Sequence, residues 1–528
     1  MGLTGELIVG SERVRSATTF APRQTSTGQS LSPPFYAADK GIVDRACDLA
    51  WSAFEPYREL GFERRARFLE AIADEIVALG DELLSRACSE SGLPLARLTG
   101  ERARTANQLR LFATEVRNGG WLGLRVDPAL PDRQPLPRSD LRQYKVPLGP
   151  VAVFGASNFP LAFSVAGGDT AAALAAGCPV VVKGHPAHPG TSELVAQAIV
   201  AAVNACGMPR GVFSLLNGES HELGAALVRH PRIKAVGFTG SRAGGLALVK
   251  IASERPEPIP VYAEMSSINP VVLLPAALAS RTEALAKEFV GSLTLGTGQF
   301  CTNPGFLIAV NGPDLDRFIA AAAATLSQVP TSVMLTAGIH AAYESGVDRL
   351  LQHARVRVIG RGADPQSLSC GRAALFEVDA AAVLEHREIT EEVFGPSSMI
   401  VRCANEEELL GVLGQLEGQL TATLHFLEPD VHLARRLLKV LEGKVGRLIA
   451  NGWPTGVEVS HAMVHGGPFP ATSDGRSTSV GTLAIDRFLR PVCYQGFPDS
   501  LLPAPLRSEE FTSNPHRYDG EYRTGARP

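Results

Sequence analysis

One cysteine stands directly after a glycine-bearing turn, in the segment Gly296-Thr297-Gly298-Gln299-Phe300-Cys301-Thr302-Asn303. A thiolate is a strong nucleophile once its pKa is lowered or a base stands beside it. A tightly bent backbone would present the Cys301 sulfur to a substrate. Taken alone, however, the segment favours the more common role of a cysteine, which is a buried structural one.

Two further polar residues follow apolar runs. Glu264 ends the run 259–263, where a carboxylate is either solvated at a strand end or held as a general base. Asn158 follows the run 151–154, and ligands of open parallel sheets gather at the carboxyl ends of strands. An amide there can donate a hydrogen bond to an oxyanion, or can simply occupy the turn before Pro160.

The elements that must position these residues alternate between strand and helix. Amphipathic helices are expected over 43–92 and 95–116, from apolar residues spaced three and four apart. The Pro-rich segment 127–139 is expected to lead into an extended arm. Two alternating regions then predict two α/β units with parallel sheets. Their strands are expected over 151–154, 180–183, 212–216, 235–238, 270–274, 306–310, 398–402, 421–426 and 447–451, with helices between 163 and 230 and over 281–295.

Composition excludes several classes of function. The 528 residues include 50 basic and 54 acidic side chains, a balance that argues against nucleic acid or an anionic membrane surface as a partner. No run is apolar for the roughly 20 residues of a membrane span, and no signal-peptide pattern opens the chain. The eight cysteines include no CxxC pair. We therefore expect a cytoplasmic protein with reduced thiols and no metal site.

Six motifs occur in one order along nearly the whole chain: Asn158, Lys183, Gly237-Phe238-Thr239-Gly240-Ser241, Glu264, Cys301 and Glu392-Val393-Phe394-Gly395-Pro396. In this order and spacing the chain resembles the aldehyde dehydrogenase superfamily. The resemblance implies a Rossmann-like cofactor domain (1–125, 147–264 and 446–484) and an α/β catalytic domain (265–445). It also implies a β oligomerisation arm with a C-terminal tail (126–146 and 485–528), and a homodimer or homotetramer.

The resemblance also implies catalytic roles. Cys301 is similar to the nucleophile that forms a thioester with the aldehyde. Asn158 and the backbone N–H of Cys301 resemble the oxyanion hole. Glu264 is similar to the base that activates water for hydrolysis of the thioester.

Cofactor residues are carried over in the same way. Lys183 matches the residue at the adenosine ribose, Gly240 and Ser241 open the helix that faces the pyrophosphate, and Glu392 and Phe394 match the residues at the nicotinamide ribose and ring. NAD-preferring members often carry a Glu three positions after the lysine, but Pro186 stands here. Nothing acidic at that position would repel a 2′-phosphate, with which Lys183 could pair. His221 is another potential phosphate neighbour, or an exposed loop residue. NADP is therefore the preferred cofactor and NAD the alternative.

Four segments resemble the α-ketoglutaric semialdehyde (2,5-dioxopentanoate) dehydrogenase branch of the superfamily: Met265-Ser266-Ser267, 183–190, 300–305 and 452–468. A substrate with a 2-keto acid end would need a cation in its pocket. Arg104 and Gln108 lie four apart, on one face of the helix 95–116, and are candidates for substrate contact, although an exposed helix face would also explain them.

Phe159, His461 and His465 complete the candidate substrate residues. Phe159 is the neighbour of Asn158, and the two histidines lie in a loop that the family places over the substrate channel. Each histidine could contact the substrate, serve a proton path, or only pack the loop.

Other functions stay open at this point. The main alternative is a fatty or general aldehyde dehydrogenase that uses NADP. A dehydrogenase that passes the acyl group to coenzyme A usually lacks the base at the position of Glu264. A non-catalytic scaffold would not need Cys301, Asn158, Glu264 and Glu392 together.

Overall fold

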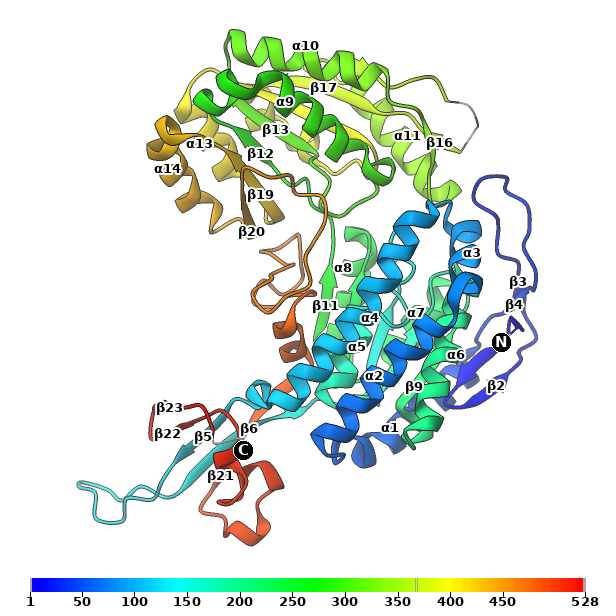
Figure 1. Cartoon of the computed structure of the whole chain (residues 1–528), viewed down its shortest axis with the longest axis vertical. Coiled ribbons are helices and arrows are strands. Elements are labelled where there is room, and N and C mark those ends of the chain that lie inside the picture. Colours follow the sequence, from blue (N-terminus) through cyan, green and yellow to red (C-terminus); the bar gives the residue numbers. More distant parts are fainter. Residues whose placement is uncertain (1, 366, 368, 526–528) are drawn as a thin grey trace.

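The first of two seven-stranded sheets forms the lower body of the molecule (Figure 1). The computed structural model describes residues 2–365, 367 and 369–525. The strand order is β11-β10-β7-β8-β9-β1-β2, and the first five strands run parallel. Their apolar residues are buried on both faces, as a parallel sheet requires. The bounds are β1 Leu7–Val9, β2 Glu12–Val14, β7 Val151–Phe154, β8 Val180–Lys183, β9 Phe213–Leu216, β10 Ala235–Thr239 and β11 Val261–Glu264.

Helices cover both faces of this sheet. One apolar core joins α2, α4, α5 and α6 to one face, and a second joins α1, α7 and α8 to the other. The helix expected from residue 163 begins only at Gly168, because residues 159–167 form turns after Asn158. The bounds are α1 Lys40–Arg58, α2 Phe62–Ala78, α3 Gly80–Ser91, α4 Leu95–Asn118, α5 Gly168–Ala176, α6 Pro189–Ala205, α7 His221–Arg229 and α8 Arg242–Ser253.

The second sheet lies above the first in Figure 1, in the order β15-β17-β18-β13-β12-β19-β20. All its strand pairs are parallel except β15 with β17. Its bounds are β12 Val271–Leu273, β13 Phe306–Val310, β15 Arg357–Arg361, β17 Ala374–Asp379, β18 Ser397–Cys403, β19 Gln419–His425 and β20 Val445–Ala450. The helices of this unit are α9 Pro275–Thr294, α10 Pro313–Ser327, α11 Ala337–Gln352, α12 Ala380–Glu385, α13 Glu406–Gln415 and α14 Val431–Leu441.

One expected boundary between the two units is wrong. Residues 446–450 were expected in the cofactor domain, but they form β20, which pairs in parallel with β19 on the second sheet. The backbone hydrogen bonds of this pair place the strand with the catalytic unit, and the chain crosses back to the first unit only after Ala450.

A third sheet projects away from both units (Figure 1). Its order is β21-β6-β5-β22-β23, so it joins the segment expected as an arm to the C-terminal segment. Its bounds are β5 Leu124–Asp127, β6 Leu141–Pro147, β21 Leu489–Gln495, β22 His516–Tyr518 and β23 Glu521–Arg523. Two short pairs are separate: β3 Thr19–Phe20 with β4 Phe35–Tyr36, and β14 Ser332–Val333 with β16 Cys370–Gly371. Within the described residues, no helix combines the length and apolarity of a membrane span.

Asn269 ties the two units to the turn that carries Cys301. Its backbone is left-handed (φ 46°) and its side chain is fully buried. Nδ2 donates to the carbonyls of Cys301 (2.8 Å) and Asn303 (2.9 Å), while Oδ1 accepts from Ser267 (2.9 Å) and Thr421 (3.1 Å). One amide therefore holds the turn against both the β11–β12 connection and β19.

We expect Asn269→Ala to destabilise the protein by about 2–4 kcal/mol, because it leaves the Cys301 carbonyl and the buried Thr421 hydroxyl unpaired at about 1–3 kcal/mol each. Alanine is also disfavoured in the left-handed region. The measurement is the thermal unfolding midpoint. The matched control is Asn204→Ala, at an exposed residue of α6. Equal midpoints for the two variants would show that the Asn269 bonds do not stabilise the turn.

Candidate functional site

Cys301 lies in a tight turn between α9 and β13. Before it, the 3₁₀ segment η3 (Leu295–Gly298) takes left-handed backbone angles at Gly296, Thr297 and Gly298. A Cβ on Gly298 would come within 2.4 Å of the Gly395 carbonyl, so the glycine lets the turn contact the Glu392–Pro396 motif. The expectation of a bent backbone before the cysteine is confirmed.

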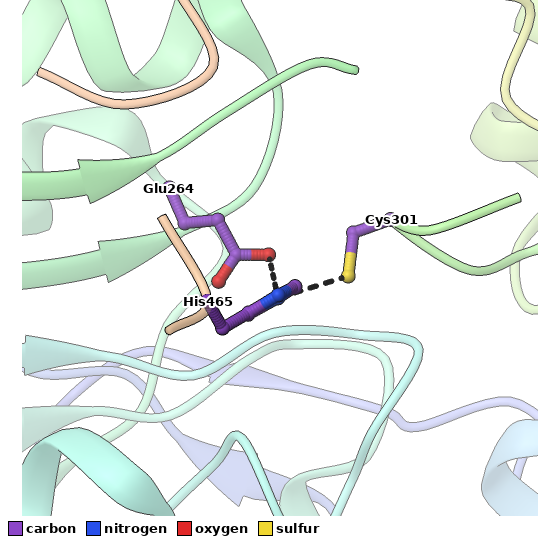
Figure 2. Close-up of side chains that lie close together, drawn as sticks. All are labelled: Glu264, Cys301 and His465. Atoms are coloured by element: carbon purple, nitrogen blue, oxygen red, sulfur yellow. Dashed lines mark hydrogen bonds and ion pairs between the residues drawn. The ribbon is translucent and has the colours of Figure 1, made fainter. Parts of the chain in front are cut away.

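Figure 2 shows that His465 stands between Cys301 and Glu264. Its Nε2 is 3.4 Å from Sγ of Cys301 and 2.9 Å from Oε1 of Glu264. The hydroxyl of Ser479 donates to the other carboxylate oxygen, Oε2, at 2.9 Å. The sequence predicted His465 over the channel, and the structure brings it into contact with both the expected nucleophile and the expected base.

Burial and charge set the protonation of this cluster. Burial raises the pKa of the Cys301 thiol well above its usual value, and the Glu264 carboxylate adds to the effect. Burial alone would raise the pKa of Glu264 as well. The adjacent His465 and the hydrogen bonds from His465, Cys301 and Ser479 outweigh burial and lower this pKa. The resting state is therefore a thiol beside a carboxylate, with the His465 imidazole in contact with both.

Asn158 is buried next to the same turn. Its Nδ2 donates to the carbonyl of Gln299 at 3.1 Å, two residues before Cys301. The backbone carbonyl of Asn158 accepts a hydrogen bond from the Arg97 guanidinium at 2.6 Å. The amide is thus close to the nucleophile, and its role as an oxyanion donor stays a prediction.

An aromatic wall flanks Cys301. The ring of Phe159 meets Phe300 edge-on at 5.4 Å and Phe163 at 5.2 Å. The guanidinium of Arg97 lies over both Phe159 (4.8 Å) and Phe300 (4.6 Å). Phe159 therefore packs against the residue before Cys301, and its contact with the substrate stays a prediction. Sequence analysis missed Arg97, whose only signal is its position one helical turn before the buried Glu101.

Two arginines meet at the segment 454–457. Arg104 donates to the carbonyl of Val457, while its Nε and Nη2 are buried without a partner among the described residues. Arg447 donates to the carbonyls of Pro454 (2.7 Å) and Gly456 (2.9 Å), and its buried Nε also lacks a partner there. Unpaired buried donors are costly, so a bound anion would satisfy them. Sequence analysis missed Arg447, because β20 gave no signal of a site.

Burial lowers the pKa of both arginines, whereas the nearby Cys301 raises it. Both guanidinium groups therefore interact electrostatically with the Cys301 sulfur.

Two other candidate substrate residues lie apart from this cluster. Gln108 is buried against the start of α5, where a Cβ on Gly168 would lie 2.7 Å from its Nε2. The His461 side chain is 62% exposed and contacts Thr482 (3.2 Å) and Glu115 (3.7 Å). The three residues between His461 and His465 belong to an irregular loop, so the two imidazoles do not share a face.

The expected cofactor residues lie at the carboxyl edge of the first sheet. Lys183 ends β8, and burial lowers its pKa to about 8, although Glu219 acts in the opposite direction. Gly240 follows β10 and bonds the carbonyl of Glu264 (3.1 Å), and Ser241 caps α8 by accepting from the Gly244 N–H. Because parallel strands end at the same edge, Lys183, Gly240 and Ser241 lie at the same edge of the sheet. Pro186 lies between β8 and α6, and His221 opens α7.

Glu392 and Phe394 approach the site from the second unit. They line a cavity that also includes Gly298 and Asn303 of the Cys301 turn. Burial raises the pKa of Glu392 to about 7, although bonds from Ser266 and Ser267 oppose the shift. The helix N-terminus at Ser241, the partly buried Lys183 and the Glu392 carboxylate fit a dinucleotide, which needs partners for phosphate and for ribose hydroxyls.

Comparison with known proteins tests the resemblance seen in the sequence. The model of the aldehyde dehydrogenase family matches residues 15–479. Alpha-ketoglutaric semialdehyde dehydrogenase 2 of Azospirillum brasilense is 61% identical over 523 residues, which is 99% of this chain and 100% of that protein. Alpha-ketoglutaric semialdehyde dehydrogenase of Acinetobacter baylyi is 49% identical over 505 residues, covering 95% and 96% of the two chains.

Solved structures share the fold at lower identity. A 1-pyrroline-5-carboxylate dehydrogenase superposes with a TM-score of 0.79 at 21% identity, covering 93% of this chain and 92% of that one. A betaine aldehyde dehydrogenase mutant from Staphylococcus aureus gives 0.80 at 20% identity, covering 94% and 96%. The expected α/β fold is confirmed, and the match along the chain shows that this protein belongs to the aldehyde dehydrogenase family.

Proposed function

We propose that the protein oxidises α-ketoglutaric semialdehyde to 2-oxoglutarate with a nicotinamide dinucleotide, through a thioester on Cys301. The observation that carries the proposal is the contact of the Cys301 thiol with His465 and Glu264 at the junction of the two units. The names and high identities of the two Azospirillum and Acinetobacter relatives support the substrate. The unit built on the first sheet binds the cofactor, and the unit on the second sheet supplies the nucleophile.

Thioester formation begins with the thiol. As Sγ of Cys301 adds to the aldehyde carbon, the thiol proton passes to Nε2 of His465, which is 3.4 Å away, while the proton that Nε2 already shares with Oε1 of Glu264 moves onto that carboxylate and leaves to solvent before hydrolysis. The new oxyanion accepts hydrogen bonds from Nδ2 of Asn158 and the backbone N–H of Cys301. Donors placed in this way contribute about 3–4 kcal/mol each to transition-state stabilisation.

The dinucleotide supplies the hydride acceptor when it is bound. Lys183 binds the adenosine ribose or a 2′-phosphate on it, with Pro186 and His221 flanking. Gly240 and Ser241 present the N-terminus of α8 to the pyrophosphate. The remaining two residues, Glu392 and Phe394, hold the nicotinamide ribose and flank the ring.

Hydrolysis of the thioester uses Glu264 as a general base. Its lowered pKa keeps it ionised, and Ser479 fixes one oxygen so that the other can take a proton from water. General base catalysis of this kind contributes about 10²–10⁴-fold.

Arg104 and Arg447 bind the 2-keto acid end of the substrate. Their buried N–H groups without partners need a hydrogen-bond acceptor, which a carboxylate offers and an alkyl chain does not. This feature favours a short anionic semialdehyde over a fatty aldehyde.

We also propose that the projecting sheet makes contacts between subunits of a homodimer or homotetramer. An outer strand such as β21 exposes unpaired backbone groups that a neighbouring subunit would cover.

The substrate assignment predicts that kcat/KM for α-ketoglutaric semialdehyde exceeds that for hexanal by roughly 100-fold, about 2.7 kcal/mol of transition-state discrimination. Arg104→Gln is expected to reduce this preference at least about tenfold, because the carboxylate loses a buried charged partner. Steady-state kinetics with NADP+ measure both ratios.

The matched control for this experiment is Arg110→Gln, since Arg110 lies on the same helix but pairs with Asp74 at the surface. It should keep the preference of the parent protein. A parent protein that prefers hexanal would overturn the substrate assignment and keep only the aldehyde chemistry.

His465→Gln is expected to lower kcat/KM by about 10²-fold or more, because no other imidazole contacts Sγ of Cys301 among the described residues. Cys301→Ala should abolish aldehyde oxidation. His461→Gln is the control, since its imidazole is exposed. Aldehyde oxidation that survives in Cys301→Ala would disprove the nucleophile, and equal rates for the two histidine variants would remove His465 from the proton path.

NADP+ binding is expected to weaken as the pH rises above about 8. Lys183 has a pKa of about 8, so the free protein carries this charge at pH 7 and loses it by pH 9. The dissociation constant for NADP+ should therefore rise about tenfold from pH 7 to pH 9, and that for NAD+ should rise less. Titration calorimetry at each pH gives both values. A pH-independent NADP+ constant would show that Lys183 does not meet the 2′-phosphate.

A further inference from the structure

The same three side chains offer one ligand atom each to a metal ion. Sγ of Cys301, Nε2 of His465 and a carboxylate oxygen of Glu264 lie within 4.8 Å of one another. Figure 2 shows all three pointing toward one another from separate segments. Thiolate, imidazole and carboxylate are the ligand types of zinc, and three such ligands with one open position are typical of accessible zinc sites.

The spacing suits zinc with little movement. Bonds of about 2.3 Å to sulfur and about 2.0–2.1 Å to nitrogen and oxygen place tetrahedral ligands about 3.3–3.6 Å apart. The observed separations are 3.4 Å for Sγ to Nε2 and 2.9 Å for Nε2 to Oε1. The third separation, from Sγ to the carboxylate oxygen, lies within 4.8 Å and would have to close toward about 3.6 Å when the ion binds.

A hydrogen bond from a neighbouring residue holds one of the three ligands, Glu264, in place. The Ser479 hydroxyl already orients Glu264 through its second oxygen, as hydrogen bonds behind metal ligands commonly do. The positive charges of Arg104 and Arg447 near Cys301 oppose a cation. These charges would keep the affinity moderate and the binding reversible.

We propose that Zn²⁺ binds reversibly to Cys301, His465 and Glu264 and inhibits the enzyme in competition with the aldehyde. On binding, the S–H bond of Cys301 breaks, a Zn–S bond forms and the proton leaves to solvent, with no change of oxidation state. The inhibitory effect rests on the proposed roles of Cys301 and Glu264, but the binding itself does not.

A second cluster in the described residues provides an internal control. His353, His386 and Glu388 also lie within 4.8 Å of one another, at the partly exposed ends of α11 and α12. This cluster contains no thiol, so it can bind a divalent ion but cannot produce a metal–thiolate signal.

Cobalt is the probe, because Co²⁺ accepts the same ligands as zinc and a cobalt–thiolate bond absorbs in the near ultraviolet. The full-length protein is titrated with Co²⁺ and then with Zn²⁺. We expect one equivalent of Co²⁺ to produce the thiolate band and Zn²⁺ to remove it. Cys301→Ser should eliminate the band. His465→Gln and Glu264→Gln should each weaken Co²⁺ binding about tenfold or more.

The double variant His353→Asn/His386→Asn should keep the band and its affinity. In steady-state assays, Zn²⁺ should raise KM for the aldehyde with little effect on kcat, and a chelator should restore activity. Co²⁺ binding that is unchanged in His465→Gln would overturn the three-ligand site in favour of the thiol alone. Loss of binding in the double variant would place the metal at the surface cluster. The absorption titration contains no aldehyde, so its outcome is independent of which substrate the enzyme oxidises.

Discussion

The site depends on one nitrogen atom, Nε2 of His465, that lies within reach of both a thiol and a carboxylate. Its partners are 164 and 201 residues away along the chain. All three groups are removed from water to a large degree, where an unpaired polar or charged group is costly. Each of the three side chains finds its hydrogen-bond partner only when three segments meet in one arrangement. These segments are the first unit, the Cys301 turn and the loop before Thr478.

The scaffold meets this demand through buried amides rather than through charge pairs. Asn269 holds the carbonyls of the Cys301 turn, and Gln419 at the start of β19 accepts from both the Ser267 hydroxyl and the Ile268 N–H. These contacts join the strand that ends in Glu264 to the second sheet. Neutral amides can lock backbone positions in this way without the desolvation cost of buried ions.

Sequence reasoning succeeded where local patterns are strong. Buried parallel strands such as β7 and β8 appear as short apolar runs, and motif order identified the family. It failed where position depends on long-range pairing. The placement of β20 is set by hydrogen bonds to β19, and the different surroundings of His461 and His465 are set by an irregular loop without periodicity. Arg447 was missed for the same reason, since only the fold brings it near the nucleophile.

The chemistry that makes the cluster useful also makes it vulnerable. Nε2 of His465 lies within reach of both the Cys301 thiol and the Glu264 carboxylate, so a proton can move among the three groups. The proposed thioester chemistry uses that property. A divalent ion in place of the proton would satisfy all three groups at once. The two nearby arginines would oppose such an ion and, in the proposed function, favour an anionic substrate, so one pair of charges would both select the substrate and limit the competing metal.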